Sequence, residues 1–193
     1  MPFRFEPASS SAAASPKKKP MTLRDSKLGD SYYAFLNKHI LPALEYASVS
    51  PNQLTISGLV FALLVPFGFY LNPGYGFALM LVSGIADTLD GALSRKQGNG
   101  SRYGAFLDST TDRAADFSFL FGFWVLFWKE PRFLLATGLI FSGIFLTFLI
   151  SYTKARAEGL NGSCRVGFMG RETRTIYLLI WAALLSLLEG ARQ

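Results

Sequence analysis

Five of the seven aspartates in the chain lie within thirty residues, from Asp87 to Asp116, and strongly apolar segments flank that stretch. Four of them form two pairs, Asp87 with Asp90 and Asp108 with Asp112. On a helix, residues three or four apart share one face, because each residue advances the helix by about 100°. Each pair is therefore predicted to present two carboxylates in one direction. Carboxylates at membrane depth are costly to keep, so such a cluster indicates a functional site.

The segment between the two pairs predicts how they meet. Residues 96–101 read Lys-Gln-Gly-Asn-Gly-Ser, a composition typical of a turn. A reversal of the chain there brings the two pairs face to face. Carboxylate oxygens without any histidine or cysteine suit a hard cation, so the pattern predicts a site for Mg²⁺ or Mn²⁺.

The rest of the sequence indicates an all-α integral membrane protein. Half of the residues are hydrophobic, 17% are charged and 18 are phenylalanine. The single cysteine, Cys164, excludes an internal disulfide. Five segments approach the roughly 20 residues that cross a bilayer as a helix. They are 54–71, 75–93, 104–128, 133–153 and 174–189.

Lysine and arginine predict the orientation of these spans. Of the 19 such residues, seven precede the first span, three lie in residues 94–103 and five in residues 154–174. Lys129, Arg132 and Arg192 lie on the other side of the predicted bilayer. Because cytoplasmic loops are enriched in these cations, both aspartate pairs are predicted to face the cytoplasm.

Two segments are predicted ahead of the first span. Residues 1–20 are polar, contain three consecutive lysines and lack the apolar core of a signal peptide, so we expect a disordered tail. Residues 28–49 are predicted to form an amphipathic helix in the membrane interface, because apolar side chains recur there at four-residue intervals. Ser50 followed by Pro51 is typical of a helix N-cap and first turn.

Other interpretations of the same residues stay open at this point. The aspartates could be structural, and Asp116 in particular could pair with Arg113. Gly91 could be a helix-packing residue, and the cations of residues 154–174 could be topology signals. A small cation transporter could also use intramembrane aspartates, and so could a membrane prenyltransferase that binds Mg²⁺. If the aspartates are structural, they would form salt bridges with Arg95, Arg102 or Arg113.

Residues 87–112 resemble the signature of the CDP-alcohol phosphotransferase family: D-x2-D-G-x2-A-R, eight residues, then G-x3-D-x3-D. Every spacing matches, and the one departure is Ser94 in place of the family's alanine. The resemblance implies one membrane domain at 21–193, a role in phospholipid biosynthesis and a homodimer in a bacterial or archaeal inner membrane. Family members usually have six spans, whereas five are predicted here.

The resemblance also implies the reaction and the residues that carry it. A phosphatidyl group passes from CDP-diacylglycerol to the hydroxyl of a small alcohol, and CMP is released. Two Mg²⁺ or Mn²⁺ ions are implied on Asp87, Asp90, Asp108 and Asp112, with Asp112 also the base for the hydroxyl. The implied CDP-lipid contacts are Asn52, Thr55, Gly91, Arg95 and Ser101. The implied acceptor contacts are Lys154, Arg156, Arg171 and Arg174.

Local features favour a phosphorylated polyol such as inositol phosphate as the acceptor. The residues after Asp112 and the basic segments around Lys154 and Arg171 resemble the phosphatidylinositol-phosphate and archaetidylinositol-phosphate synthases. A phosphate dianion needs several cationic donors, which these segments supply. Glycerol 3-phosphate or another alcohol would suit the same cluster. The scattered basic residues do not indicate nucleic acid.

Overall fold

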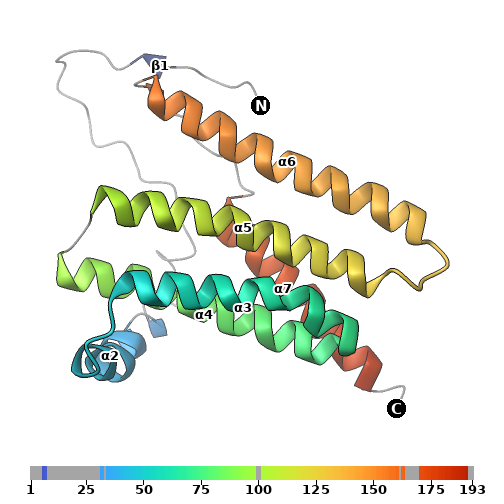
Figure 1. Ribbon diagram of the computed structural model, residues 1–193, viewed down its shortest axis with the longest axis horizontal. Helices are drawn as coiled ribbons and strands as arrows, with labels where there is room; N and C mark the ends of the chain where they lie inside the picture. The colour runs from blue at the N-terminus through green and yellow to red at the C-terminus, as the bar shows by residue number, and fades with distance from the viewer. Residues whose placement is uncertain are drawn as a thin grey trace.

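Five long helices make up most of the protein (Figure 1). The computed structural model describes residues 6–7, 31–32, 34–98, 101–160, 162–163 and 170–190. The all-helical membrane fold predicted from the sequence is confirmed, and each helix covers one predicted span. The helices are α3 (Pro51–Leu71), α4 (Pro73–Gln97), α5 (Arg102–Leu126), α6 (Phe133–Gly159) and α7 (Arg171–Gly190).

Helix α3 is the common support of the site-bearing helices, because it packs against both α4 and α5. Glycines permit these close approaches. A Cβ atom on Gly58 would lie 3.2 Å from the Cβ of Ala86 on α4, and one on Gly122 of α5 would lie 2.8 Å from Phe69 Cδ2 on α3. A buried hydrogen bond from Ser83 Oγ to the Gly58 carbonyl, 2.8 Å long, adds a polar link between α3 and α4. Small residues and interhelical hydrogen bonds are the usual means of packing helices in a bilayer.

The outer helices are attached differently. Helix α7 packs against α4, and α6 packs against α5. In Figure 1, α6 lies along one side of the bundle, next to α5. Only 6% of the most apolar 18-residue stretch of α6 is buried within the chain, compared with 33% of the corresponding stretch of α3 and 44% of that of α4. Most of α6 is therefore left for lipid or another protein to cover.

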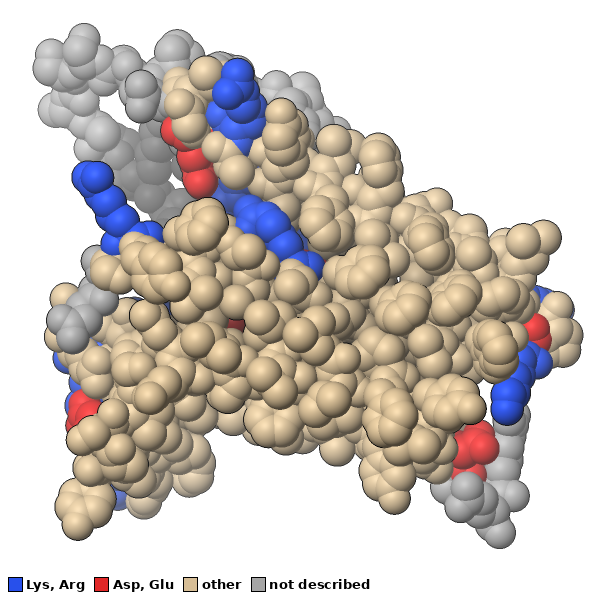
Figure 2. Space-filling view, in the orientation of Figure 1, with Lys and Arg blue, Asp and Glu red and all other residues tan. Residues whose placement is uncertain are grey.

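Three of the described helices, α3, α4 and α6, have the length and apolar character needed to cross a membrane. Helices α5 and α7 fall outside that group, although both have at least 20 residues. Their site-bearing turns account for the difference, since α5 contains three aspartates and α7 begins with charged residues. Figure 2 shows a broad, largely uncharged surface across the middle of the visible face, with charged side chains mostly toward the ends of the helices. This distribution is typical of a membrane-embedded surface.

The helix ends follow the chemistry of their sequences. Ser50 caps α3 in a reciprocal capping box, in which Gln53 N–H donates to Ser50 Oγ and Ser50 N–H donates to Gln53 Oε1. This confirms the predicted N-cap. Helix α4 ends at Gly98, whose φ of 65° is the left-handed conformation that glycine adopts without strain. Ser101 caps α5 by accepting a hydrogen bond of 2.9 Å from Gly104 N–H. The described residues on either side of the predicted turn are therefore a helix C-cap, Gly98, and a helix N-cap, Ser101.

A short helical segment precedes the bundle. It consists of a π-helical turn, η2 (Leu36–Ile40), and then α2 (Leu41–Tyr46). Leu36 and Leu41 are buried against α4, and Lys96 of α4 forms an ion pair of 2.7 Å with Glu45. The predicted amphipathic helix 28–49 ends earlier than expected, at Tyr46, and its first residues lie outside the described part of the chain. One face of the described part packs onto the bundle.

The predicted N-terminal tail, residues 1–20, lies mostly outside the described residues. The part that is described is the two-residue strand β1 (Glu6–Pro7), which pairs antiparallel with β2 (Gly162–Ser163). This ladder lies beside the C-terminal end of α6 in Figure 1.

Candidate metal and substrate site

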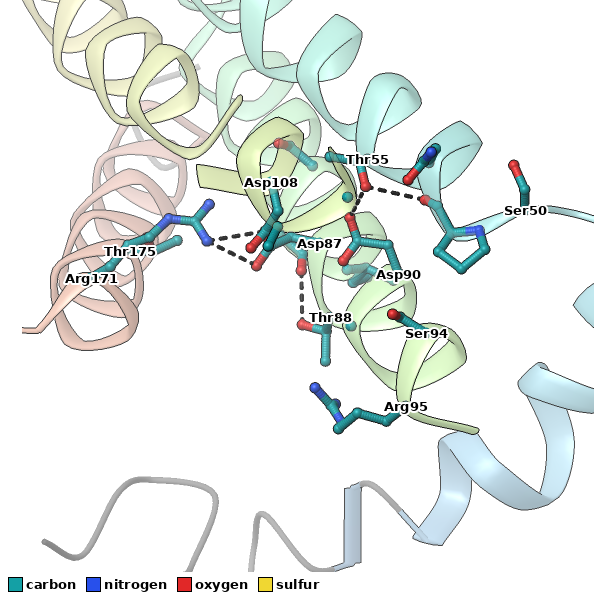
Figure 3. Close-up of a pocket in the computed structure, with 18 of the residues that line it drawn as sticks. Ser50, Thr55, Asp87, Thr88, Asp90, Ser94, Arg95, Asp108, Arg171 and Thr175 are labelled. Carbon is teal, nitrogen blue, oxygen red and sulfur yellow. Dashed lines mark hydrogen bonds and ion pairs between the residues drawn. The ribbon is translucent and has the colours of Figure 1, made fainter. Parts of the chain in front are cut away.

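Three carboxylates converge at the end of the bundle where α4 ends and α5 begins. Asp87 and Asp90 come from α4 and Asp108 from α5, and one carboxylate oxygen of each lies within 4.8 Å of the others. Asp90 is buried, Asp87 is half-buried and Asp108 is exposed. Figure 3 shows the three side chains directed toward one another beside the start of α3. The sequence prediction that the turn brings the two helices' carboxylates together agrees with this geometry.

Thr55 of α3 contacts this cluster through its hydroxyl group. Its hydroxyl lies 2.5 Å from Asp90 Oδ2 and 3.1 Å from the Pro51 carbonyl oxygen. A hydroxyl has one proton, so the shorter contact, to a charged acceptor, is the stronger hydrogen bond. Thr55 thus fixes the orientation of a buried carboxylate from a neighbouring helix.

The donor set fits a hard divalent cation. The three converging residues offer only carboxylate oxygens, which suit Mg²⁺ or Mn²⁺ better than a soft metal. Like charges this close repel one another in a medium of low dielectric constant, and a bound cation removes that repulsion. The cluster therefore has both the chemistry and the electrostatic need for a cation.

Asp112 stands slightly apart from this group and pairs with an arginine. Its Oδ1 atom lies 2.7 Å from Nη1 of Arg171, at the start of α7. The same nitrogen donates to both carboxylate oxygens of Asp87, at 3.0 and 3.2 Å. The structure thus brings three of the four predicted metal ligands together and connects the fourth to them through Arg171.

A second ion pair lies one helical turn deeper. Asp116 Oδ2 lies 2.8 Å from Arg174 Nη2, with side-chain exposures of 7% and 16%. Asp116 is therefore in a structural ion pair, but its partner is Arg174 and not Arg113, the partner that one interpretation of the sequence gave it. Arg113 instead donates hydrogen bonds to the carbonyl and hydroxyl of Ser109, one turn earlier on its own helix. That local contact engages Nη1 of Arg113, and Asp116 pairs with α7 instead.

The acidic cluster borders a cavity of about 1380 Å³ that opens at this end of the bundle. One part of its wall is polar and carries the carboxylates. Another part is apolar and includes Leu81 and Ile85 of α4 and Ile176 and Leu179 of α7. All five residues expected to contact a CDP-lipid line the same cavity, namely Asn52, Thr55, Gly91, Arg95 and Ser101.

Gly91 faces the cavity one residue beyond Asp90. A Cβ atom at this position would lie 3.1 Å from Nη1 of Arg95, which is the movable end of a long side chain. The glycine therefore leaves space in front of the Arg95 guanidinium. Among the described residues, the three atoms nearest to such a Cβ all belong to Arg95 of the same helix, which does not support helix-to-helix packing as the role of Gly91.

The four predicted acceptor residues divide between two places. Arg171 lines the cavity, and Arg174 pairs with Asp116 beneath it. Lys154 and Arg156 are exposed near the end of α6, where Lys154 lies 3.9 Å from Glu158, and neither belongs to the described cavity wall. The structure therefore joins the α7 cations to the acidic cluster and leaves the α6 cations at its periphery.

Sequence reasoning did not assign several of the lining residues to the site, and two of them are polar side chains from other helices. Tyr32, in the segment before α2, and Thr175, on α7, both border the cavity. Tyr32 belongs to the apolar stripe of the predicted interfacial helix, so the pattern located its helix but not its approach to the site. Thr175 follows Arg174 directly, and its role depends on the packing of α7 on α4.

Comparison with known proteins connects this geometry to a family. The family described as CDP-alcohol phosphatidyltransferase matches residues 48–192. An archaetidylinositol phosphate synthase from Pyrococcus horikoshii is 38% identical over 136 residues, which cover 68% of each chain. A phosphatidylinositol phosphate synthase from Mycolicibacterium smegmatis is 34% identical, over 79% of this chain and 69% of that protein.

Solved structures give the same result. The phosphatidylinositol phosphate synthase of Mycobacterium tuberculosis with CDP-DAG bound aligns with a TM-score of 0.64 and 30% identity, over 74% of this chain and 73% of that one. A structure of the same enzyme in complex with manganese and citrate aligns with a TM-score of 0.63 and 29% identity, over 74% and 69% of the two chains.

Proposed function

The chain belongs to the CDP-alcohol phosphatidyltransferase family, and from this premise we propose that it transfers the phosphatidyl group of CDP-diacylglycerol to a hydroxyl of inositol phosphate. The observation that carries the proposal is the cavity in which a carboxylate cluster and an apolar wall meet. The carboxylates suit the metal-bound diphosphate of the donor, and the apolar wall suits its acyl chains. A cation transporter or a prenyltransferase would not need the signature of residues 87–112, which this chain matches at every position except Ser94.

The acidic residues would hold the divalent ion. Asp87, Asp90 and Asp108 offer the ligand oxygens. Asp112, which shares Arg171 with Asp87, would contribute to a second ion. When bound, such ions neutralise the diphosphate and orient it for displacement. The proposal includes two bound ions, each Mg²⁺ or Mn²⁺. The manganese complex of the M. tuberculosis relative supports a divalent ion.

The chain's own groups perform the proton transfer and the positioning. Asp112 accepts the proton of the acceptor hydroxyl as its oxygen forms a bond to the phosphorus that carries the diacylglycerol. The bond from that phosphorus to the CMP oxygen breaks, and CMP leaves with both electrons of the bond. A carboxylate is a weak base for an alcohol, so the transfer must be concerted with attack on a positioned substrate. Thr55 contributes by orienting Asp90.

The nucleotide part of the donor would occupy the polar wall of the cavity. Asn52 and Thr55 lie at the start of α3, whereas Gly91 and Arg95 lie at the end of α4. Gly91 lets the donor approach the helix, and Arg95 offers a guanidinium to a phosphate oxygen. Ser101 Oγ accepts the α5 capping bond from Gly104 N–H, so its O–H would remain free to donate to a phosphate oxygen at the cavity mouth.

The phosphate of the acceptor would bind cations at the entrance. Arg171 already lines the cavity, and Lys154 and Arg156 are further donors expected from the sequence. Arg174, the fourth residue expected there, is engaged by Asp116. The relatives named archaetidylinositol phosphate synthase and phosphatidylinositol phosphate synthase support inositol phosphate over glycerol 3-phosphate. The active site would face the cytoplasm, as the distribution of lysine and arginine predicts. A homodimer would cover part of the apolar surface of α6.

The decisive test is metal-dependent release of CMP. Purified protein in nanodiscs would receive CDP-diacylglycerol, Mg²⁺ or Mn²⁺, and one acceptor from a panel containing inositol phosphate, glycerol 3-phosphate, serine and inositol. We expect CMP release to need the divalent ion and to be fastest with inositol phosphate. Faster release with glycerol 3-phosphate would reassign the acceptor, and no release with any acceptor would refute the proposed reaction.

A further inference from the structure

Arg171 lies between the two acidic pairs, where the cluster needs a cation. Its Nη1 atom lies 3.0 Å from Asp87 Oδ1 and 2.7 Å from Asp112 Oδ1. Asp87 also belongs to the three-carboxylate cluster with Asp90 and Asp108. One carboxylate therefore belongs both to the arginine's ion pair and to the proposed metal site, and Figure 3 shows Arg171 reaching this cluster from α7.

The guanidinium of Arg171 is incompletely satisfied in this position. Its Nε atom is buried and has no hydrogen-bond partner among the residues that the structure describes. A buried donor without a partner destabilises the arrangement that contains it. The side chain as a whole is 30% exposed and lines the cavity, so space for another orientation lies directly beside it.

Helix α7 has an anchor that does not depend on Arg171. Arg174 lies three residues later and pairs with Asp116, which in turn lies four residues after Asp112. The two ion pairs are thus successive steps along the facing sides of α5 and α7. Because the deeper pair is the more buried, α7 can keep its position while Arg171 changes partners.

We propose that Arg171 is an internal counter-cation that a divalent ion displaces. Ion binding to Asp87, Asp90 and Asp108 draws Asp87 away from the guanidinium and adds a repulsive charge beside it. Arg171 then turns into the cavity, where it binds the phosphate of the acceptor. Ion binding and acceptor binding are therefore coupled, and by linkage each strengthens the other. This inference rests on the metal site of the proposed function.

Arginine-selective labelling of the intact protein tests the displacement. The full chain in nanodiscs would be treated with phenylglyoxal, with and without Mn²⁺, and the modified residues located by mass spectrometry. We expect Mn²⁺ to raise the labelling of Arg171 several-fold, while Arg174 stays slow in both conditions as an internal control. Mn²⁺ binding would be followed separately by electron paramagnetic resonance. Bound Mn²⁺ with unchanged or lower labelling of Arg171 would overturn the inference and leave the metal site intact.

The affinity for Mn²⁺ gives an independent measurement. Arg171→Gln should bind Mn²⁺ about tenfold more tightly or better, because one charge-assisted hydrogen bond corresponds to roughly that factor. Lys96→Gln is the matched control. It also removes one positive charge at the same end of the bundle, but from a lysine whose ion-pair partner is Glu45. Equal affinities for Arg171→Gln and the unmodified protein would overturn the inference. Failure of the unmodified protein to bind Mn²⁺ would overturn the metal site and, with it, the displacement.

Discussion

The hydrogen bond from Thr55 to Asp90 allows a sharp test of how the site is built. Replacing Thr55 by valine keeps the shape of the side chain and exchanges the hydroxyl for a methyl group. The bond is 2.5 Å long and its acceptor is a buried carboxylate. A hydrogen bond to a charged group contributes roughly 1.5–3 kcal/mol, which corresponds to about a 10- to 100-fold change in a rate or an equilibrium constant.

We therefore expect Thr55→Val to lower kcat/KM for CMP release by about 10- to 100-fold when the divalent ion is below saturation. Because Asp90 is a proposed ligand of that ion, raising the ion concentration should recover part of the loss. The assay is the initial rate of CMP release over a series of Mg²⁺ concentrations in nanodiscs.

Two variants make the test specific. Thr55→Ser keeps the hydroxyl and should retain most of the activity. Thr110→Val removes a hydroxyl that donates to the carbonyl of Phe106 on the exposed side of α5, and it should leave the rate unchanged. If Thr55→Val keeps more than half of the wild-type kcat/KM at low ion concentration, Thr55 does not position Asp90.

Four further outcomes are expected. Asp108→Asn should abolish CMP release, with a loss beyond the 10- to 100-fold typical of residues that only support a ligand, while circular dichroism shows an unchanged helical fold; retained activity would refute its role as a ligand. Gly122→Ala should lower the free energy of unfolding by about 1–3 kcal/mol, because the added methyl group would overlap a phenylalanine of α3. An unchanged melting temperature would show that α3 and α5 can move apart to accept the methyl group without loss of stability. In a cysteine-free background, a membrane-impermeant thiol reagent should label intact cells with Lys129→Cys and not those with Lys96→Cys, and labelling of both would break the proposed orientation. Lys154→Ala should raise the acceptor KM by about tenfold and leave the KM for CDP-diacylglycerol unchanged; equal KM values for the acceptor would make this lysine a topology signal.

Local spacing was enough to predict the elements that carry the chemistry. The three- and four-residue gaps between aspartates fix their faces on α4 and α5, and the glycine-rich turn fixes the reversal between the helices. Ser50 and Gln53 determine the start of α3 through contacts three residues apart. Such features depend on helix geometry and not on the rest of the fold, which is why the sequence alone was sufficient for them.

The partners of the ionised groups could not be predicted in the same way. Arg171 and Asp87 are 84 residues apart, and Arg174 and Asp116 are 58 apart. Their pairing depends on where α7 lies relative to α4 and α5, and hydrophobic periodicity does not encode that arrangement. Asp116 had a nearby cation, Arg113, three residues earlier on the same face. In the structure, Arg113 donates hydrogen bonds to Ser109 instead. The sequence alone does not show which of these partners Arg113 contacts.

The apolar core that adjoins the cavity has a consequence for how reactants and products reach the site. Val65, Met80 and Ala182 are fully buried in the apolar core cluster, which also contains Phe119 of the cavity wall. A solute that enters the cavity therefore meets packed hydrocarbon and must leave by the end through which it came. Water-soluble reactants and products would exchange with a single compartment, and a lipid would move sideways into one leaflet. Turnover then needs no alternation between inward- and outward-open states, and a transmembrane ion gradient would have nothing to drive.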